Sequence, residues 1–102
     1  MGYFQITATV TAMGNLPVAN PVVLWRPVPS FNSNLVEYQY QFFATIADMN
    51  NSLMFKPKDF YCSINDSSLD LTDTANWASM RSQAETLLEA IPEIGDNVTY
   101  VV

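Results

Sequence analysis

The chain has 102 residues, of which 49% are hydrophobic and only 14% are charged, so one packed globular domain over residues 1–102 is expected. Its net charge is −6 and its few cations are spread along the sequence, so we expect neither nucleic acid nor a membrane as a partner. There is no histidine, and Cys62 is the single cysteine, so neither an internal disulfide nor a cysteine-based zinc site can form. We therefore expect no enzyme, no metal centre and no cofactor, and no signal-peptide pattern is recognisable.

The first predicted element is a strand over residues 3–13. Its apolar and polar residues alternate, with Ile6, Ala8, Val10 and Ala12 on one face and Gln5, Thr7, Thr9 and Thr11 on the other. This period of two is typical of a half-buried strand. The Gly14–Pro21 stretch that follows predicts a loop, because Gly, Asn and Pro interrupt regular structure.

Residues 22–26 are predicted to form a second strand, bounded by Pro21, Pro27 and Pro29. Proline cannot donate a hydrogen bond to a neighbouring strand, which favours a position at the edge of the sheet. Trp25 is then the best candidate for an exposed aromatic residue, next to Arg26.

The strongest alternating pattern covers residues 35–48. The apolar face carries Val36, Tyr38, Tyr40, Phe42, Ala44 and Ile46. Because strands are usually about five or six residues long, this segment is expected to bend at Phe42–Phe43 or to project from the sheet as an arm. Residues 53–55 and 60–64 are then predicted to form a hairpin across the Lys56–Asp59 turn.

From Thr72 the hydrophobic period becomes helical, and a helix is predicted over about residues 73–91, ended by Pro92. A short uncharged strand over residues 98–102 follows. The predicted fold is therefore α+β, with an antiparallel sheet of about five or six strands and one amphipathic helix packed on one face. An uncharged terminal strand lies inside the sheet or pairs with a neighbouring chain.

The stretch from Phe60 to Trp77 contains Asp66, Asp70 and Asp73 close to the predicted start of the helix. Carboxylates there cap free amide groups and complement the helix dipole, which is the favoured interpretation. Their spacing lacks the alternating ligands and central glycine of a helix–loop–helix calcium site, so a weakly held cation is the second interpretation.

The same stretch resembles a short element of small β modules. It reads Phe60-Tyr61-Cys62, then Asn-Asp-Ser-Ser, then Asp-x-Thr-Asp-Thr-x-x-Trp, and the matching residues are Phe60, Tyr61, Asp66, Asp73 and Trp77. Such modules occur in bacteriophage virion proteins (tail, fibre and head-decoration components) and in some chitin-binding domains. The resemblance implies association with a virion, or alternatively binding to a sugar.

These observations predict a non-enzymatic structural or interaction protein, most simply a small bacteriophage virion component that assembles with other protein as a homo-oligomer or on a larger surface. The expected interaction surface comprises Trp25, Arg26, Tyr61, Tyr100 and Val102. Two alternatives stay open: a carbohydrate-binding module that uses Trp25 or Tyr61, and an acidic phage-encoded inhibitor of a host enzyme or defence system.

Overall fold

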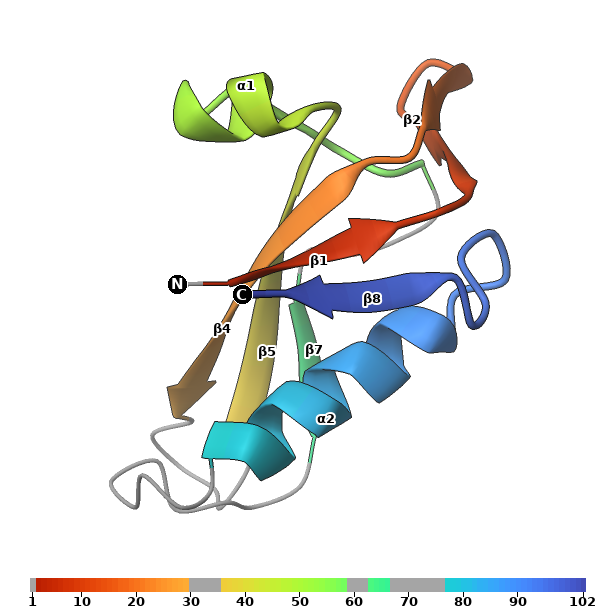
Figure 1. Ribbon diagram of the computed structural model, residues 1–102. Coiled ribbons are helices and arrows are strands. Elements are labelled where there is room, and N and C mark those ends of the chain that lie inside the picture. The colour runs from red at the N-terminus through yellow and green to blue at the C-terminus, as the bar shows by residue number, and fades with distance from the viewer. Residues whose placement is uncertain (1, 30–35, 59–62, 67–76) are drawn as a thin grey trace.

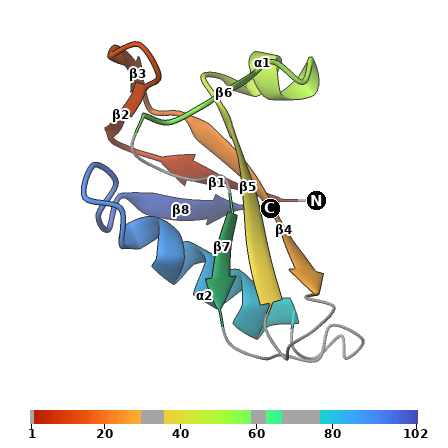
Figure 2. The same ribbon diagram turned by 180° about the vertical axis from the view of Figure 1, so that it is seen from behind.

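The computed structural model of the protein describes residues 2–29, 36–58, 63–66 and 77–102. Its strands are β1 (Tyr3–Ile6), β2 (Thr9–Ala12), β3 (Leu16–Ala19), β4 (Val22–Pro29), β5 (Val36–Phe43), β6 (Met54–Phe55), β7 (Ser63–Asp66) and β8 (Val98–Val101). Its helices are α1 (Ile46–Asn50) and α2 (Trp77–Glu89). The predicted α+β class is confirmed: a strongly twisted antiparallel sheet carries α2 on one face (Figures 1 and 2).

The main sheet has the order β8, β1, β4, β5, and β6 and β7 both pair with the outer edge of β5. Phe42 of β5 lies opposite Phe55 of β6, and Tyr38 lies opposite Ile64 of β7. The predicted hairpin between the segments at 53–55 and 60–64 is therefore wrong, because both segments pair with β5 in series. The reason lies at Pro57, which leaves β5 and forms a bridge to Ala12 of β2 instead.

The first predicted strand is divided in two between Ile6 and Thr9. β1 joins the main sheet, whereas β2 pairs with β3 in a separate two-stranded sheet. The alternation itself holds across the break, since Ile6, Val10 and Ala12 are buried. The loop expected from Gly14 to Pro21 thus contains β3, and the turn before it places Gly14 and Asn15 at φ angles of 85° and 63°, where glycine and asparagine are favoured.

Strand β4 lies inside the sheet, so the predicted edge position is wrong for its first half. Val22 and Val23 pair with β1 on one side and with β5 on the other. Pro27 and Pro29 follow where, in the described part of the chain, β5 is the only neighbour. The prolines therefore lie where a missing N–H group interrupts no pairing. The edge rule is correct at these positions, but it does not extend to the first half of β4.

Strand β5 ends at Phe43 and does not continue as an arm. The Thr45 side chain accepts a hydrogen bond from the backbone N–H of Asp48 at 3.0 Å and so caps the N-terminus of α1. This local side-chain cap offers the backbone an alternative to extending the strand. Ile46, predicted to share the buried face of the strand, is exposed on α1.

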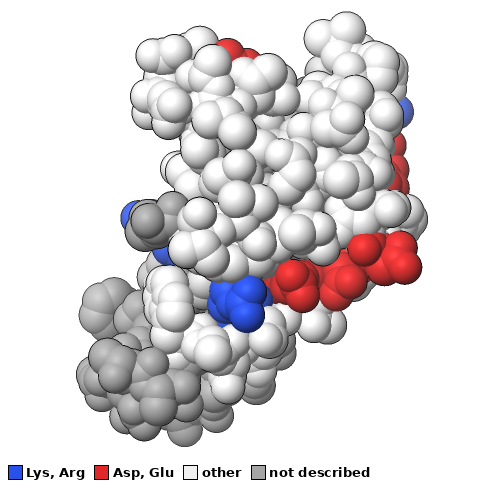
Figure 3. Space-filling view, in the orientation of Figure 1, with Lys and Arg blue, Asp and Glu red and all other residues white. Residues whose placement is uncertain are grey.

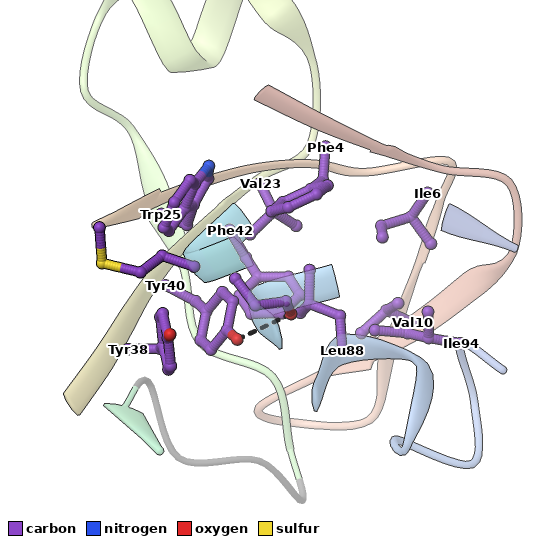
Figure 4. Packing of buried hydrophobic residues seen from close by; sticks show 12 residues of the cluster. Phe4, Ile6, Val10, Val23, Trp25, Tyr38, Tyr40, Phe42, Leu88 and Ile94 are labelled. Atoms are coloured by element: carbon purple, nitrogen blue, oxygen red, sulfur yellow. Dashed lines mark hydrogen bonds between the residues drawn. The ribbon is translucent and has the colours of Figure 1, made fainter. Parts of the chain in front are cut away.

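The core lies between the sheet and α2, as Figure 4 shows. Helix α2 buries Met80, Ala84 and Leu88, as its helical period predicts, against the sheet residues Phe4, Ile6, Val23, Trp25, Tyr38, Tyr40 and Phe42. Two tyrosines also fix the helix through hydrogen bonds. The Tyr40 hydroxyl donates to the carbonyl oxygen of Ala84 at 2.9 Å, and the Tyr38 hydroxyl donates to Gln83 Oε1 at 2.5 Å. The predicted helix start near residue 73 lies outside the described residues.

Candidate functional site

The two tryptophans form a stacked pair at the start of α2. Their ring centroids lie 4.9 Å apart with an interplanar angle of 30°. Trp25 is only 8% exposed, and Trp77, which is 45% exposed, covers it. The expectation of an exposed Trp25 is therefore wrong, because its side of β4 faces α2 and Trp77 covers the ring. Trp77 presents the accessible aromatic surface.

The other residues of the predicted interaction surface do not form one site. Arg26 is exposed, and its Nε donates to Gln39 Oε1 at 2.7 Å, which holds the guanidinium against β5. Tyr61 lies outside the described residues, as do Cys62, Asp59, Asp70 and Asp73. Asp66 is the last residue of β7, and the capping role predicted for Asp70 and Asp73 stays a prediction because both lie outside the described residues.

Tyr100 and Val102 lie together on or just beyond β8, at the edge of the main sheet. The Tyr100 ring packs edge-on against Phe4 at 5.3 Å, and the Arg81 guanidinium lies over its outer face at 4.6 Å from the ring centroid. Val102 is fully exposed. Among the described strands, β8 pairs with β1 alone, so its outer edge is an unpaired edge without charged side chains. Such an edge can bind a further strand.

Gly2 makes the close packing of Tyr100 possible. A Cβ atom at this position would collide with the Tyr100 ring and would lie 2.5 Å from the carbonyl oxygen of Val101. The sequence gives no signal of this requirement. Glycine is needed at position 2 because the ring of Tyr100, which lies near the other end of the chain, packs against it, and not because of a turn.

The largest accumulation of exposed apolar residues lies at the opposite end of the molecule from the start of α2. We call it the apolar end: Met13 and Leu16 of the β2–β3 hairpin, and Ile46, Leu53 and Met54 at α1 and β6. These are five of the seven large hydrophobic residues exposed in the described chain, the others being Trp77 and Val102. Figures 1 and 2 both show the hairpin and α1 at this end, and Figure 2 also shows β6 there.

The apolar end consists of two projections that stand apart in Figure 3. An open hollow of about 690 Å³ lies between the start of α1 and the β3–β4 turn, and Ala19, Val22 and Ala47 are part of its wall. On the visible face the projections carry little charge: Figure 3 shows an acidic group on the α1 side and a basic group at the outer edge of the hairpin side. Scattered exposed apolar residues are normal, but a gathering of them marks a surface that binds protein or another apolar partner.

A small apolar cavity of about 110 Å³ lies between β2, β5 and the segment after α2, lined by Val10, Phe42, Ile91 and Ile94 among others. At its rim the Glu93 carboxylate accepts hydrogen bonds from the Thr11 backbone N–H at 3.2 Å and from the Thr11 hydroxyl at 2.6 Å. Ligand pockets usually measure about 300–1,000 Å³, so this cavity accommodates one side chain and not a typical substrate.

Among the residues that the structure describes, no three His, Cys, Asp or Glu side chains come together in a way that could hold a metal ion. Within the same residues, neither α1 nor α2 is long and apolar enough to cross a membrane. Comparison of the chain with protein-family models, with curated proteins and with solved structures found no match.

Sequence reasoning missed the apolar end because its residues belong to segments assigned to loops or to the wrong element. The sequence pattern predicts a loop at Leu16, the buried face of a strand at Ile46, and a hairpin at Leu53 and Met54. Each is an unremarkable apolar residue in the sequence. A usable signal existed in Asn50-Asn51-Ser52 followed by Leu53-Met54, where two apolar residues follow a polar turn directly.

Proposed function

We propose that this protein is a non-enzymatic interaction protein that acts by assembling with other protein, as a small component of a bacteriophage virion. The observation that carries the proposal is the apolar end, where five large hydrophobic side chains are exposed on two weakly charged projections. A monomer gains no stability from exposing such residues. Their burial against a partner would stabilise the complex by about 25 cal/mol for each Å² of apolar surface removed from water.

The virion assignment rests on two further features: the resemblance of residues 60–77 to elements of virion β modules, and a surface poor in charge. Repeated assembly in close contact requires neighbouring surfaces that do not repel each other, and the projections meet this requirement. The outer edge of β8, with which no described strand pairs, adds a second surface for contact with protein.

Site-specific crosslinking tests this function. A photoreactive amino acid is placed at Leu16 or Met54 of the apolar end, and at the exposed polar positions Ser82 and Thr86 of α2 as controls. After irradiation in the producing cells, discrete adducts with one or a few virion proteins other than this chain are expected from Leu16 and Met54 and not from the α2 positions. The protein is also expected to co-sediment with assembled particles. Absence from the particles, with no adducts from the apolar end, would refute the assignment.

A carbohydrate-binding function is the second candidate, and it is favoured by one observation, the exposed face of Trp77 stacked on Trp25. Exposed indole rings stack on sugar rings. A glycan array of the wild-type protein and of Trp77→Ala distinguishes the two functions. Glycan binding by the wild-type protein that is lost in Trp77→Ala would support the carbohydrate-binding function. An array without hits would exclude it.

A further inference from the structure

The outer edge of β8 presents a defined set of free backbone groups. In an antiparallel pair, hydrogen-bonded residue pairs alternate with non-bonded pairs. The Thr7 N–H donates to the Asn97 carbonyl at 2.9 Å, so Gln5–Thr99 and Tyr3–Val101 are the next bonded pairs in the register of β1 and β8. The N–H and C=O groups of Val98 and Tyr100 therefore point away from β1, and no described residue pairs with them.

We propose that two copies of this protein associate by antiparallel pairing of β8 with β8 around a two-fold axis through Thr99. In this register Val98 of each copy lies opposite Tyr100 of the other, and all of the outward N–H and C=O groups of these residues form hydrogen bonds. The inference deepens the proposed assembly function by naming one partner, a second copy of the chain.

The charges of α2 favour the same arrangement. Arg81 lies over Tyr100, which fixes it at the C-terminal end of β8. Helix α2 runs in the direction opposite to β8 (Figure 1), so Glu85, one turn further on, lies toward Val98. Four helical residues advance about 6 Å and two strand residues about 6.7 Å, so the Arg81–Glu85 and Tyr100–Val98 spacings match. Figure 3 shows a basic group and acidic groups in a row along α2, on the side next to β8.

Two-fold pairing exchanges the two ends of β8, and it therefore places Arg81 of each copy next to Glu85 of the other. The two α2 helices then lie antiparallel on the same face of one continuous sheet, with two opposite-charge pairs between them. A strand from an unrelated protein would satisfy the backbone groups of the edge but would leave Arg81 and Glu85 without these partners. This charge complementarity selects a second copy as the occupant.

The test is sedimentation of the purified protein over a range of concentrations, combined with charge exchange. The wild-type protein is expected to be a dimer. Arg81→Glu and Glu85→Arg each place like charges across the interface and are expected to weaken dimerisation by at least about tenfold. The double variant Arg81→Glu/Glu85→Arg restores both pairs in reversed sense, and its dimerisation is expected to recover. A mixture of the two single variants is expected to form the mixed dimer in preference to either homodimer.

Two further variants separate the proposed contacts from a general effect of charge and from a loss of the fold. Glu89→Arg changes the charge of α2 by the same amount as Glu85→Arg, so it is the matched control, and it is expected to leave the dimer within about threefold of wild type. Val98→Pro removes an outward N–H at the first position of a strand, where proline is tolerated, and is expected to weaken the dimer while circular dichroism shows an unchanged fold.

Three results would overturn this inference: a wild-type monomer at all concentrations, a dimer insensitive to both charge reversals, or a dimer abolished by changes at Leu16 and Met54 instead. None of these results bears on crosslinking of the apolar end to virion proteins, so failure of the dimer and failure of the proposed function are distinguishable. Loss of the crosslinks with a charge-sensitive dimer would refute the virion assignment and leave the dimer standing.

Discussion

The α2 side of the molecule and the apolar end differ in the exposure of their large hydrophobic residues. On the α2 side, Leu88 and Phe4 are fully buried, and the Tyr40 hydroxyl is satisfied by the Ala84 carbonyl. At the apolar end, Leu16 and Met54 are 64% and 58% exposed. The first region is held together by its own contacts, whereas the second lacks a covering element in the described chain. Stability and binding are therefore expected to depend on different residues.

Truncation of a core residue gives the largest expected effect. Leu88→Ala removes a fully buried side chain of α2 and leaves a cavity against the sheet, so a loss of about 2–5 kcal/mol in the free energy of unfolding is expected. Urea denaturation measures it. Leu16→Ala is the matched control, with the same chemical change at an exposed position, and it is expected to change stability by less than about 0.5 kcal/mol. Equal losses for the two variants would contradict the division into two regions.

Gly2→Ala is expected to have the second-largest effect and to lower the free energy of unfolding by about 1–3 kcal/mol. The new methyl group collides with Tyr100 and with the backbone carbonyl of Val101. Thermal unfolding measures it. Gly14→Asn is the control, since nothing lies within 4 Å of a Cβ atom there and asparagine tolerates the φ of +85°. A Gly2→Ala variant as stable as wild type would show that Tyr100 is not fixed against the first residues of the chain.

Tyr40→Phe removes a hydroxyl that donates to the Ala84 carbonyl in the buried layer. The loss of this hydrogen bond is expected to lower the free energy of unfolding by about 0.5–1.5 kcal/mol. Chemical denaturation measures the change. Tyr38→Phe provides the comparison, because its hydroxyl donates to the partly buried Gln83 side chain, and a smaller loss is expected. The reverse order would mean that the side-chain contact, and not the backbone contact, holds α2 on the sheet.

The smallest effect on folding is expected at the apolar end itself. Leu16→Ser combined with Met54→Ser replaces two exposed apolar side chains, so stability is expected to stay within about 0.5 kcal/mol of wild type per substitution. Retention on a hydrophobic-interaction column is expected to fall, and so is co-sedimentation with particles. The pair Ser82→Ala and Thr86→Ala on α2 serves as control. A severe loss of stability in the serine variant would show that the apolar end supports the fold.

Hydrophobic periodicity predicted the parts of the fold where one element contacts one surface. Helix α2 buries Met80, Ala84 and Leu88 at helical spacing, and β5 buries Tyr38, Tyr40 and Phe42 at alternate positions. Both patterns arise from a single buried face, and a single face is what a sequence period records. The α+β class follows from these two elements and the final strand.

Pairing partners were not predictable in the same way. Alternation says that a residue faces inward but not which strand lies beside it, so β6 and β7 were assigned to each other although both pair with β5. The break between β1 and β2 also leaves no mark, since Ile6 and Val10 keep the same alternation on two different sheets. Proline was informative about its own position alone: at Pro27 one side of β4 has no neighbour among the described strands, but this does not make the whole strand an edge.

Candidate site residues were the least predictable. The prolines around Trp25 predict an exposed side chain, but a position near a sheet edge says nothing about which face is covered, and α2 covers the Trp25 face. The apolar end depends on the distance between segments far apart in the sequence, such as Leu16 and Met54, and no local period carries that information.

The stacked tryptophans give the molecule a built-in optical probe. The sequence contains two tryptophans, and both belong to the stack, one on β4 and one at the first residue of α2. All of the indole absorption and emission therefore originates at a single joint between sheet and helix. At this separation the two chromophores couple, so undocking of the start of the helix would abolish the exciton contribution of the pair to the circular dichroism, which is superimposed on the signals of the backbone and the tyrosines.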